Sequence, residues 1–270
     1  MVRLDLAEVL RSRWLGVCLG IYGALAVAFV LVGLRESSVI GFTGMGRVLF
    51  SLCHALVFVL PLVALTLTGQ VVNRAREEGA LELFMSQPVR RTSYFAAITL
   101  VRAGALILPL VALLFVTAGV GSLSFGQAIP WAFLGRACAV SAALTWAFAA
   151  LGIAISARVR SPARSLTYLI LAWILAVALL DFGLLGLMLQ WRLNPQAVFL
   201  LAAINPVQAA RLALLSAAEP DLATLGPVGF YLANQLGPGA LLALGVAWPS
   251  AFGLLVWGLA LRRFKRDDLV

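Results

Sequence analysis

The sequence contains few charged residues and almost no lysine. Charged residues make up 11% of the 270 positions, whereas a soluble domain of this length carries about 25%. The only lysine is Lys265, near the C-terminus, and no G-x-x-x-x-G-K-[ST] segment occurs. A phosphate-binding Walker loop needs that lysine on a glycine-rich turn. The chain therefore lacks the standard machinery for ATP hydrolysis.

Residues for metal or carboxylate chemistry are also scarce. His54 is the only histidine, which excludes histidine clusters and the H-E-x-x-H zinc motif. Asp181 is the only acidic residue that we place within an apolar block, whereas an aspartate dyad needs two carboxylates. The cysteines, Cys18, Cys53 and Cys138, are scattered over three apolar blocks and form no disulfide framework. Cys53 and His54 are adjacent and diverge by about 100° on a helix, so helix packing is favoured over a metal site.

The sequence contains several long segments of apolar residues. Hydrophobic residues occupy 63% of positions, and the mean hydropathy is +1.03. A helix needs about 20 apolar residues to cross the hydrocarbon core of a membrane. Six segments meet this requirement: 14–34, 48–69, 95–118, 129–155, 166–188 and 240–261. We expect an all-α polytopic membrane protein that forms a single domain over residues 1–270 and is surrounded by the lipid bilayer.

The basic residues predict how the chain is oriented. Fourteen of them fall on one side of the predicted membrane: Arg3, Arg11, Arg13, Arg74, Arg76, Arg90, Arg91, Arg158, Arg160, Arg164, Arg262, Arg263, Lys265 and Arg266. Four fall on the other side: Arg35, Arg47, Arg192 and Arg211. This bias predicts that both termini are cytoplasmic. The basic residues form no basic face with interleaved aromatics, so the net charge of +9 does not indicate nucleic-acid binding.

Two connecting segments have a structural interpretation. Residues 1–13 mix leucine and valine with charged side chains, which predicts an amphipathic helix on the inner leaflet before the first span. Residues 189–239 form a long external segment whose apolar runs are broken by proline and are too short to cross the bilayer. We expect short helices there, packed at the outer membrane surface.

Three charged residues lie within spans or near their ends. A charge in the middle of a membrane usually faces a partner charge or a wet cavity. Arg136 lies near the outer end of its span, where an arginine side chain can extend to the membrane surface. Arg102 and Asp181 lie deeper, and for each of them a structural ion pair and a role in a transport pathway are both open.

Residues 70–94 form the most charged loop on the basic side. Leu81, Phe84 and Met85 share one helical face at i, i+3 and i+4 spacing. The acidic residues close to this face are Glu77, Glu78 and Glu82. A connecting helix on the inner leaflet is one interpretation, and a docking site for another protein is the other. The acidic residues favour a protein, because inner-leaflet helices normally carry lysine or arginine on their polar face.

The pattern E-x-G-A-L-E-L-x-x-x-x-P-V-x-R over residues 77–91 resembles the type-2 (exporter) ABC permease family. In that family the segment is the coupling helix that docks into an ATPase, and an elbow helix precedes the first span. The resemblance implies a homodimer in the bacterial cytoplasmic membrane. It also implies a separate cytoplasmic ATPase that binds ATP and Mg²⁺, so that this chain binds no cofactor. Leu81, Phe84 and Met85 would fill a groove on the ATPase, with the three glutamates at its rim.

A narrower resemblance is to the permease subunit of the copper-processing transporter for nitrous-oxide reductase maturation. The matching segments are Gly41-Phe42-Thr43, Trp131-Ala132-Phe133 with Arg136, Leu180-Asp181, and Asn205-Pro206 followed by Arg211-Leu212. The resemblance implies a periplasmic partner protein, for which Asn205, Pro206 and Arg211 are the expected contacts. It also implies delivery of a sulfur-containing or copper-related component during denitrification.

Three alternatives stay open from the sequence alone. The first is an exporter of the same class with an unrelated substrate, such as a drug, lipid or polysaccharide. The second is a membrane scaffold whose external segment holds an assembly partner and moves nothing. The third, an intramembrane enzyme, has the least support among the residues. The neighbouring genes would separate these alternatives.

Overall fold

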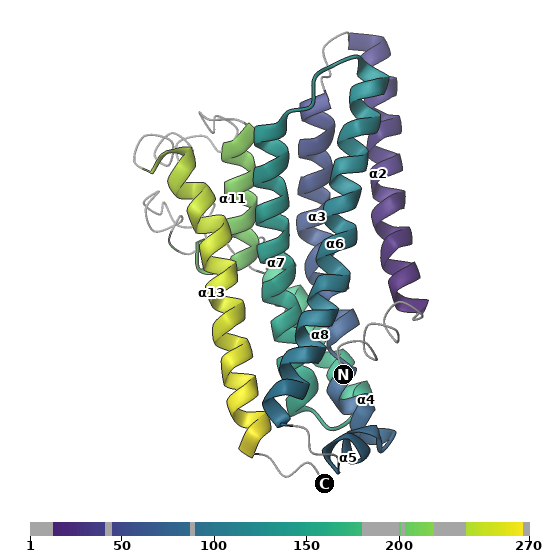
Figure 1. Ribbon diagram of the computed structural model, residues 1–270. Helices are drawn as coiled ribbons and strands as arrows, with labels where there is room; N and C mark the ends of the chain where they lie inside the picture. Colours follow the sequence, from purple (N-terminus) through teal and green to yellow (C-terminus); the bar gives the residue numbers. More distant parts are fainter. Residues whose placement is uncertain are drawn as a thin grey trace.

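The computed structural model describes residues 13–40, 45–86, 90–179, 200, 203–218 and 236–266. The regular elements in these ranges are all helices, as predicted for an all-α protein. Five long helices lie side by side: α2 (Arg13–Ile40), α3 (Met45–Thr68), α6 (Arg91–Phe125), α7 (Trp131–Arg158) and α13 (Gly237–Arg266) (Figure 1). A helix satisfies its backbone hydrogen bonds internally, so long apolar segments adopt this form in lipid.

The remaining elements are short. They are α4 (Val71–Glu77), α5 (Ala80–Met85), α8 (Pro162–Trp173), the π-helix η1 (Ile174–Leu179) and α11 (Pro206–Ala218). In Figure 1, α4 and α5 project at the lower end of the bundle, whereas α11 lies in its upper half beside α7 and α13. The π-helix η1 directly continues α8.

Four of the predicted spans are confirmed as helices that are long and apolar enough to cross a membrane. They are Val48–Glu77, Arg91–Phe125, Trp131–Arg158 and Gly237–Arg266. Two shorter apolar helices, Gly16–Val32 and Pro162–Ala178, fall in the predicted first and fifth spans. The count of six spans therefore stays a prediction. The elbow helix over residues 1–12 and the end of the fifth span lie outside the described residues.

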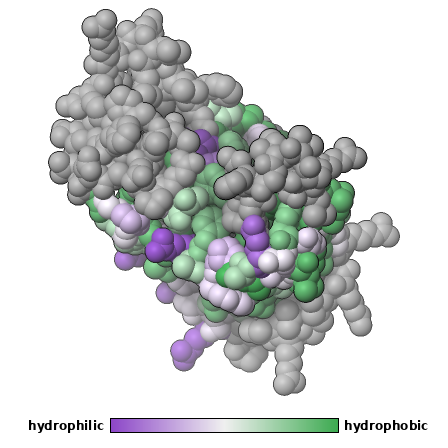
Figure 2. All heavy atoms as spheres, turned by 90° about the horizontal axis from the view of Figure 1, so that it is seen from above, coloured by the Kyte–Doolittle hydropathy of each residue, from purple (hydrophilic) through white to green (hydrophobic). Residues whose placement is uncertain are grey.

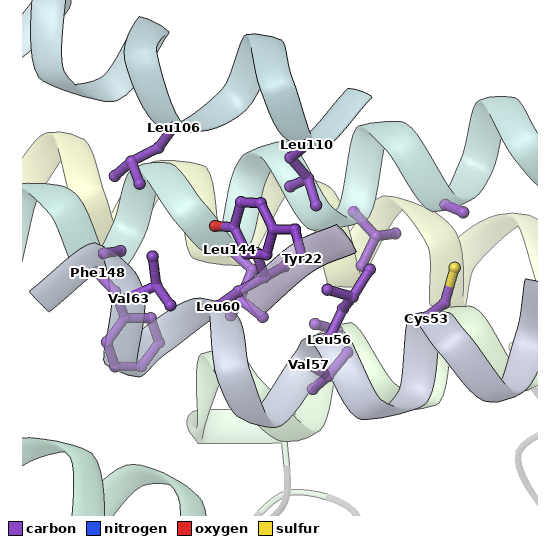
Figure 3. Close-up of a cluster of buried hydrophobic side chains, with 14 of the residues drawn as sticks. Tyr22, Cys53, Leu56, Val57, Leu60, Val63, Leu106, Leu110, Leu144 and Phe148 are labelled. Carbon is purple, nitrogen blue, oxygen red and sulfur yellow. The ribbon is translucent and has the colours of Figure 1, made fainter. Parts of the chain in front are cut away.

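The core of the bundle forms around α7. Leu144 and Phe148 of α7 meet leucines of α3 and α6, and Tyr22 of α2 joins the same cluster (Figure 3). Alanines are frequent among the buried residues of α7, and small residues let membrane helices approach closely. Seen along the bundle, hydrophobic residues extend to the rim of the described surface (Figure 2). This arrangement suits helices whose outer surface is in contact with lipid.

The loops that carry most of the arginines meet at one end of the bundle, which we call the basic end. Its described basic residues are Arg74, Arg76, Arg90, Arg91, Arg158, Arg160, Arg164, Arg262, Arg263, Lys265 and Arg266. Arg91, at the start of α6, donates a hydrogen bond to the backbone carbonyl of Lys265 in α13 at 3.1 Å. Ser165 of α8 donates to the carbonyl of Gly69, which follows α3, at 2.6 Å. The side of the membrane that this end faces stays a prediction.

Helix α11, which falls in the predicted external segment 189–239, packs among the long helices in the upper half of the bundle (Figure 1). Most of its residues are buried, and it packs against α13, α7 and α3. The position of α11 relative to the outer membrane surface stays a prediction.

Candidate functional site

The elements α4 and α5 form a tight hairpin, residues 71–86, which we call the α4–α5 hairpin. The two helices are joined at Gly79, whose φ of 70° lies in the left-handed region. Glycine adopts this conformation readily because it has no Cβ. The amide of Gly79 donates to the carbonyl of Arg76 at 3.2 Å, and the carbonyl of Gly79 accepts from the amide of Leu83 at 3.2 Å. The chain therefore turns sharply between α4 and α5.

Ser156, near the end of α7, holds the start of the hairpin. Its hydroxyl oxygen accepts hydrogen bonds from the amides of Val72 at 2.9 Å and Asn73 at 3.3 Å. The same hydroxyl donates to the side-chain oxygen of Asn73 at 3.4 Å. The first amides of a helix have no partner within the helix. A side chain from a distant helix supplies that partner here and fixes where α4 begins.

The inner face of the hairpin packs on its own chain. Leu81, Phe84 and Met85 share one face, as the spacing predicted, but that face covers an apolar cluster at the ends of α6, α7 and α13. Leu81 has an exposed fraction of 0%. Its side chain is therefore unavailable to another protein in this conformation, unlike the groove-filling contact that we expected. Helical periodicity predicts that an apolar face is buried. It does not reveal whether the same chain or a partner protein buries that face.

Five aromatic side chains connect the hairpin to two long helices. We call this set the aromatic row: Phe84 of α5, Tyr94 and Phe95 of α6, and Trp257 and Phe264 of α13. Ring centroids are 5.8 Å apart for Phe84 and Tyr94, and 6.2 Å for Tyr94 and Phe264. They are 5.1 Å apart for Phe95 and Phe264, and 6.1 Å for Phe95 and Trp257. These distances lie within the range of favourable aromatic contacts. The row gives α5 a continuous path of contacts to α6 and α13.

The outer face of the hairpin is acidic and carries one apolar side chain. The glutamates are all exposed: Glu77, Glu78 and Glu82. Leu83 has an exposed fraction of 66%. Our sequence reasoning omitted Leu83 because it falls outside the apolar face of the helix. The sequence did contain a signal for this residue, because a leucine next to a glutamate on the polar side of a short helix is an exposed apolar side chain that a partner could bind.

The residues predicted to bind a periplasmic partner lie within the bundle. Asn205 has an exposed fraction of 2%, and Pro206 begins α11. The guanidinium carbon of Arg211 lies 4.6 Å from the centroid of the Phe58 ring. Arg211 also donates to the side chain of Gln208 at 3.4 Å. The contact with Phe58 joins α11 to α3, whereas the bond to Gln208 lies within α11. Partner binding by Asn205, Pro206 and Arg211 stays a prediction that their burial does not favour.

The remaining predicted polar positions are dispersed. Arg102 is half-buried in α6, and Arg136 is half-buried in the second turn of α7. Asp181 lies outside the described residues. The ring of His54 packs against Phe50 with centroids 4.6 Å apart. Within the part of the chain that the structure describes, no three His, Cys, Asp or Glu residues are placed to hold a metal ion.

Comparison with known proteins identifies the family. Residues 1–269 match the family described as ABC-2 family transporter protein. The chain is 29% identical over 271 residues to the probable ABC transporter permease protein NosY of Stutzerimonas stutzeri, with 97% of each chain covered. It is 30% identical over 273 residues to the protein of the same name from Pseudomonas aeruginosa, again with 97% of each chain covered. The chain therefore belongs to the ABC-2 transporter family and is a permease subunit of an ABC transporter, an integral inner-membrane protein that works with an ATPase subunit.

Proposed function

We propose that the α4–α5 hairpin is the element through which a separate ATPase drives this permease. One observation carries the proposal: three exposed glutamates and the exposed Leu83 share a hairpin that projects at the basic end. The contact residues that we propose are therefore Glu77, Glu78, Glu82 and Leu83. This set retains the predicted glutamates, replaces the buried Leu81 with Leu83, and gives Phe84 and Met85 a supporting role.

Charge explains why the hairpin would bind protein rather than lipid. The inner leaflet of a bacterial membrane is negatively charged, so it attracts arginine and lysine and repels carboxylates. The arginines around the hairpin suit the membrane surface, whereas the glutamates suit a position away from it. A basic surface on the partner, with a small apolar pocket for Leu83, would complement the hairpin. Buried apolar anchors contribute most of the affinity of such contacts, and surrounding charges mainly affect association rate and specificity.

The packing of the hairpin supports a role in transmitting motion. Its inner face is close-packed on α6, α7 and α13, and Ser156 fixes its first turn. Close-packed interiors have low compressibility and transmit strain. A displacement of the hairpin by an ATPase would therefore reach the start of α6 and the end of α13 through the aromatic row.

A more specific role follows from the resemblance to permeases for nitrous-oxide reductase maturation. We propose a homodimer that acts with two ATPases and a periplasmic partner to deliver a sulfur-containing or copper-related component. The support is the similarity over nearly the whole chain to two proteins named NosY. Export of an unrelated substrate is the alternative within the same family. Deleting the gene in its host should yield a nitrous-oxide reductase that lacks its copper–sulfide cluster, measured by metal content and absorption spectrum. A fully loaded reductase would favour the alternative.

Charge reversal tests the docking role. In one variant the three exposed glutamates, Glu77, Glu78 and Glu82, become lysine, and in a matched control they become glutamine. Both variants are expressed with the ABC ATPase encoded nearest to the gene, and captured ATPase is measured per membrane-inserted permease. We expect glutamine to weaken capture and lysine to abolish it. Should the hairpin instead lie on lipid, lysine would strengthen membrane association and leave ATPase capture unchanged.

A further inference from the structure

Two helical elements meet end to end inside the bundle. The π-helix η1 continues α8 to Leu179, and α11 begins at Pro206. The side-chain amide of Asn205 donates to the carbonyl of Ala176 in η1 at 2.6 Å. The indole of Trp248 in α13 donates to the carbonyl of Ile204 at 3.0 Å. Trp248 lies about 17 Å along α13 from its first residue, at about 1.5 Å per residue. The junction therefore lies partway along the length of α13, away from its ends.

The side chain of Asn205 forms hydrogen bonds with both η1 and α11. Its oxygen accepts the amide of Val207 at 3.0 Å, which satisfies an amide in the first turn of α11, as N-cap asparagines do. Its nitrogen donates to η1. π-helical turns are rare and are frequently found at functional sites. The hydrogen bond between Asn205 and Ala176, which we call the latch, joins the cap of α11 to such a turn.

Helix α11 is bound far more tightly to α13 than to η1. Gly245 of α13 lies so close to Ala213 and to the backbone of Ala209 that a Cβ at this position would overlap both. The contact extends along α11, and Trp248 adds a hydrogen bond to Ile204. The described contact with η1, in contrast, is small and is centred on the side chain of Asn205. Helix α11 also packs on α7 and α3. If it separates from η1, it therefore moves together with these helices, and the boundary falls at the latch.

Helix α13 also extends to the hairpin at the opposite end. Phe264 stacks on Tyr94, which contacts Phe84 of α5. Helix α13 also packs closely on α7, where Gly253 lies against Ala147. We infer that α13, α7 and α11 move as one body when the hairpin is displaced, and that the latch between Asn205 and Ala176 opens in each transport cycle. Asn205 is thus a positioning residue for transport, and it holds η1 and α11 in their resting arrangement. This inference rests on the proposed function, because the docked ATPase supplies the displacement.

Reversible crosslinking tests the latch. The native cysteines are replaced with alanine, and cysteines are introduced as Ala176→Cys with Asn205→Cys. The control is Ile204→Cys with Trp248→Cys, which removes the indole hydrogen bond and links the residues before α11 to α13. The latch pair removes both hydrogen bonds of Asn205, so bridged and reduced samples of the same pair are compared. Each pair is bridged with a short bis-methanethiosulfonate reagent and released with reductant. Capture of the ATPase and ATP turnover are measured on the same lipid-reconstituted complexes.

Bridging the latch should reduce turnover about tenfold or more, with recovery after reduction, because conformational steps often limit such cycles. Bridging the control pair should leave turnover unchanged, and both pairs should capture the ATPase equally. If the latch pair hydrolyses ATP at the same rate when bridged and when reduced, and still captures the ATPase, the latch would be overturned. The proposed function would not be affected by that result. Loss of capture in every sample, even with the hairpin unaltered, would overturn the proposed function and the latch with it.

A pair of substitutions at Asn205 provides a second measurement. Asn205→Ser keeps an oxygen that can cap α11 but is too short to reach Ala176. Asn205→Ala loses both contacts. Asn205→Ser should raise ATP turnover about fivefold, the effect of removing one hydrogen bond from the resting state. Unchanged turnover in a stable, ATPase-bound Asn205→Ser complex would contradict the latch.

Discussion

The hydroxyl of Ser156 in α7 accepts the backbone amide of Val72 in α4 at 2.9 Å, across 84 positions of sequence. This contact fixes the start of the α4–α5 hairpin to the most central helix of the bundle. It also places the hairpin against α6 and α13. A short charged loop thereby acquires a defined orientation, with its glutamates outward and Leu81 inward.

Removing this contact should loosen the hairpin. Ser156→Ala leaves the first amides of α4 unpaired, which costs about 1 to 2 kcal/mol for the loss of a helix cap. Trypsin cleavage after Arg74 or Arg76 should accelerate about tenfold if cleavage follows local opening. Ser161→Ala is the control, because Ser161 precedes α8 without a side-chain capping bond. Equal cleavage rates in both variants would show that the Ser156 contact does not stabilise the hairpin.

Leu83 and Phe84 are adjacent but should differ in effect. Leu83→Ala removes an exposed side chain, so permease stability should be unchanged while ATPase capture weakens about tenfold. Phe84→Ala removes a contact with Tyr94 and should mainly lower hairpin stability. Titrated pull-down and thermal unfolding separate the two effects. Normal capture by Leu83→Ala would exclude this side chain as the anchor.

Capture of the ATPase should depend on salt. Exposed carboxylates that attract a basic partner are screened at high ionic strength. Raising salt from about 0.05 M to about 0.5 M should therefore weaken capture by the native permease. The variant with all three hairpin glutamates changed to glutamine should respond much less. A native complex that is insensitive to salt would argue for a contact dominated by Leu83.

The packing of α11 on α13 should tolerate no added methyl group. Gly245→Ala would place a Cβ against Ala213 and the backbone of Ala209, and overpacking typically costs about 1–3 kcal/mol. Gly104→Ala in α6 is the control, because its Cβ would meet nothing within 4 Å. Thermal unfolding in lipid should show a lower midpoint for Gly245→Ala only. Equal midpoints would indicate that the two helices separate easily.

Much of the architecture was predictable from the sequence, because lipid imposes simple requirements. Long apolar segments must become helices, and four of them do so where composition placed them. The arginines identified the loops that meet at the basic end, since basic residues concentrate on one side of a membrane. The pattern over residues 77–91 indicated the permease family, to which the chain belongs.

Tertiary structure alone decided how individual side chains are used. The spacing of Leu81, Phe84 and Met85 predicted one apolar face, but only packing revealed that α6, α7 and α13 cover it. Asn205 was recognisable as part of a motif, yet its bond to Ala176 joins residues 29 positions apart. Local sequence determines which faces must be buried, because that depends on composition and helical period. It does not determine what buries them, because that depends on contacts between segments that are distant in the chain.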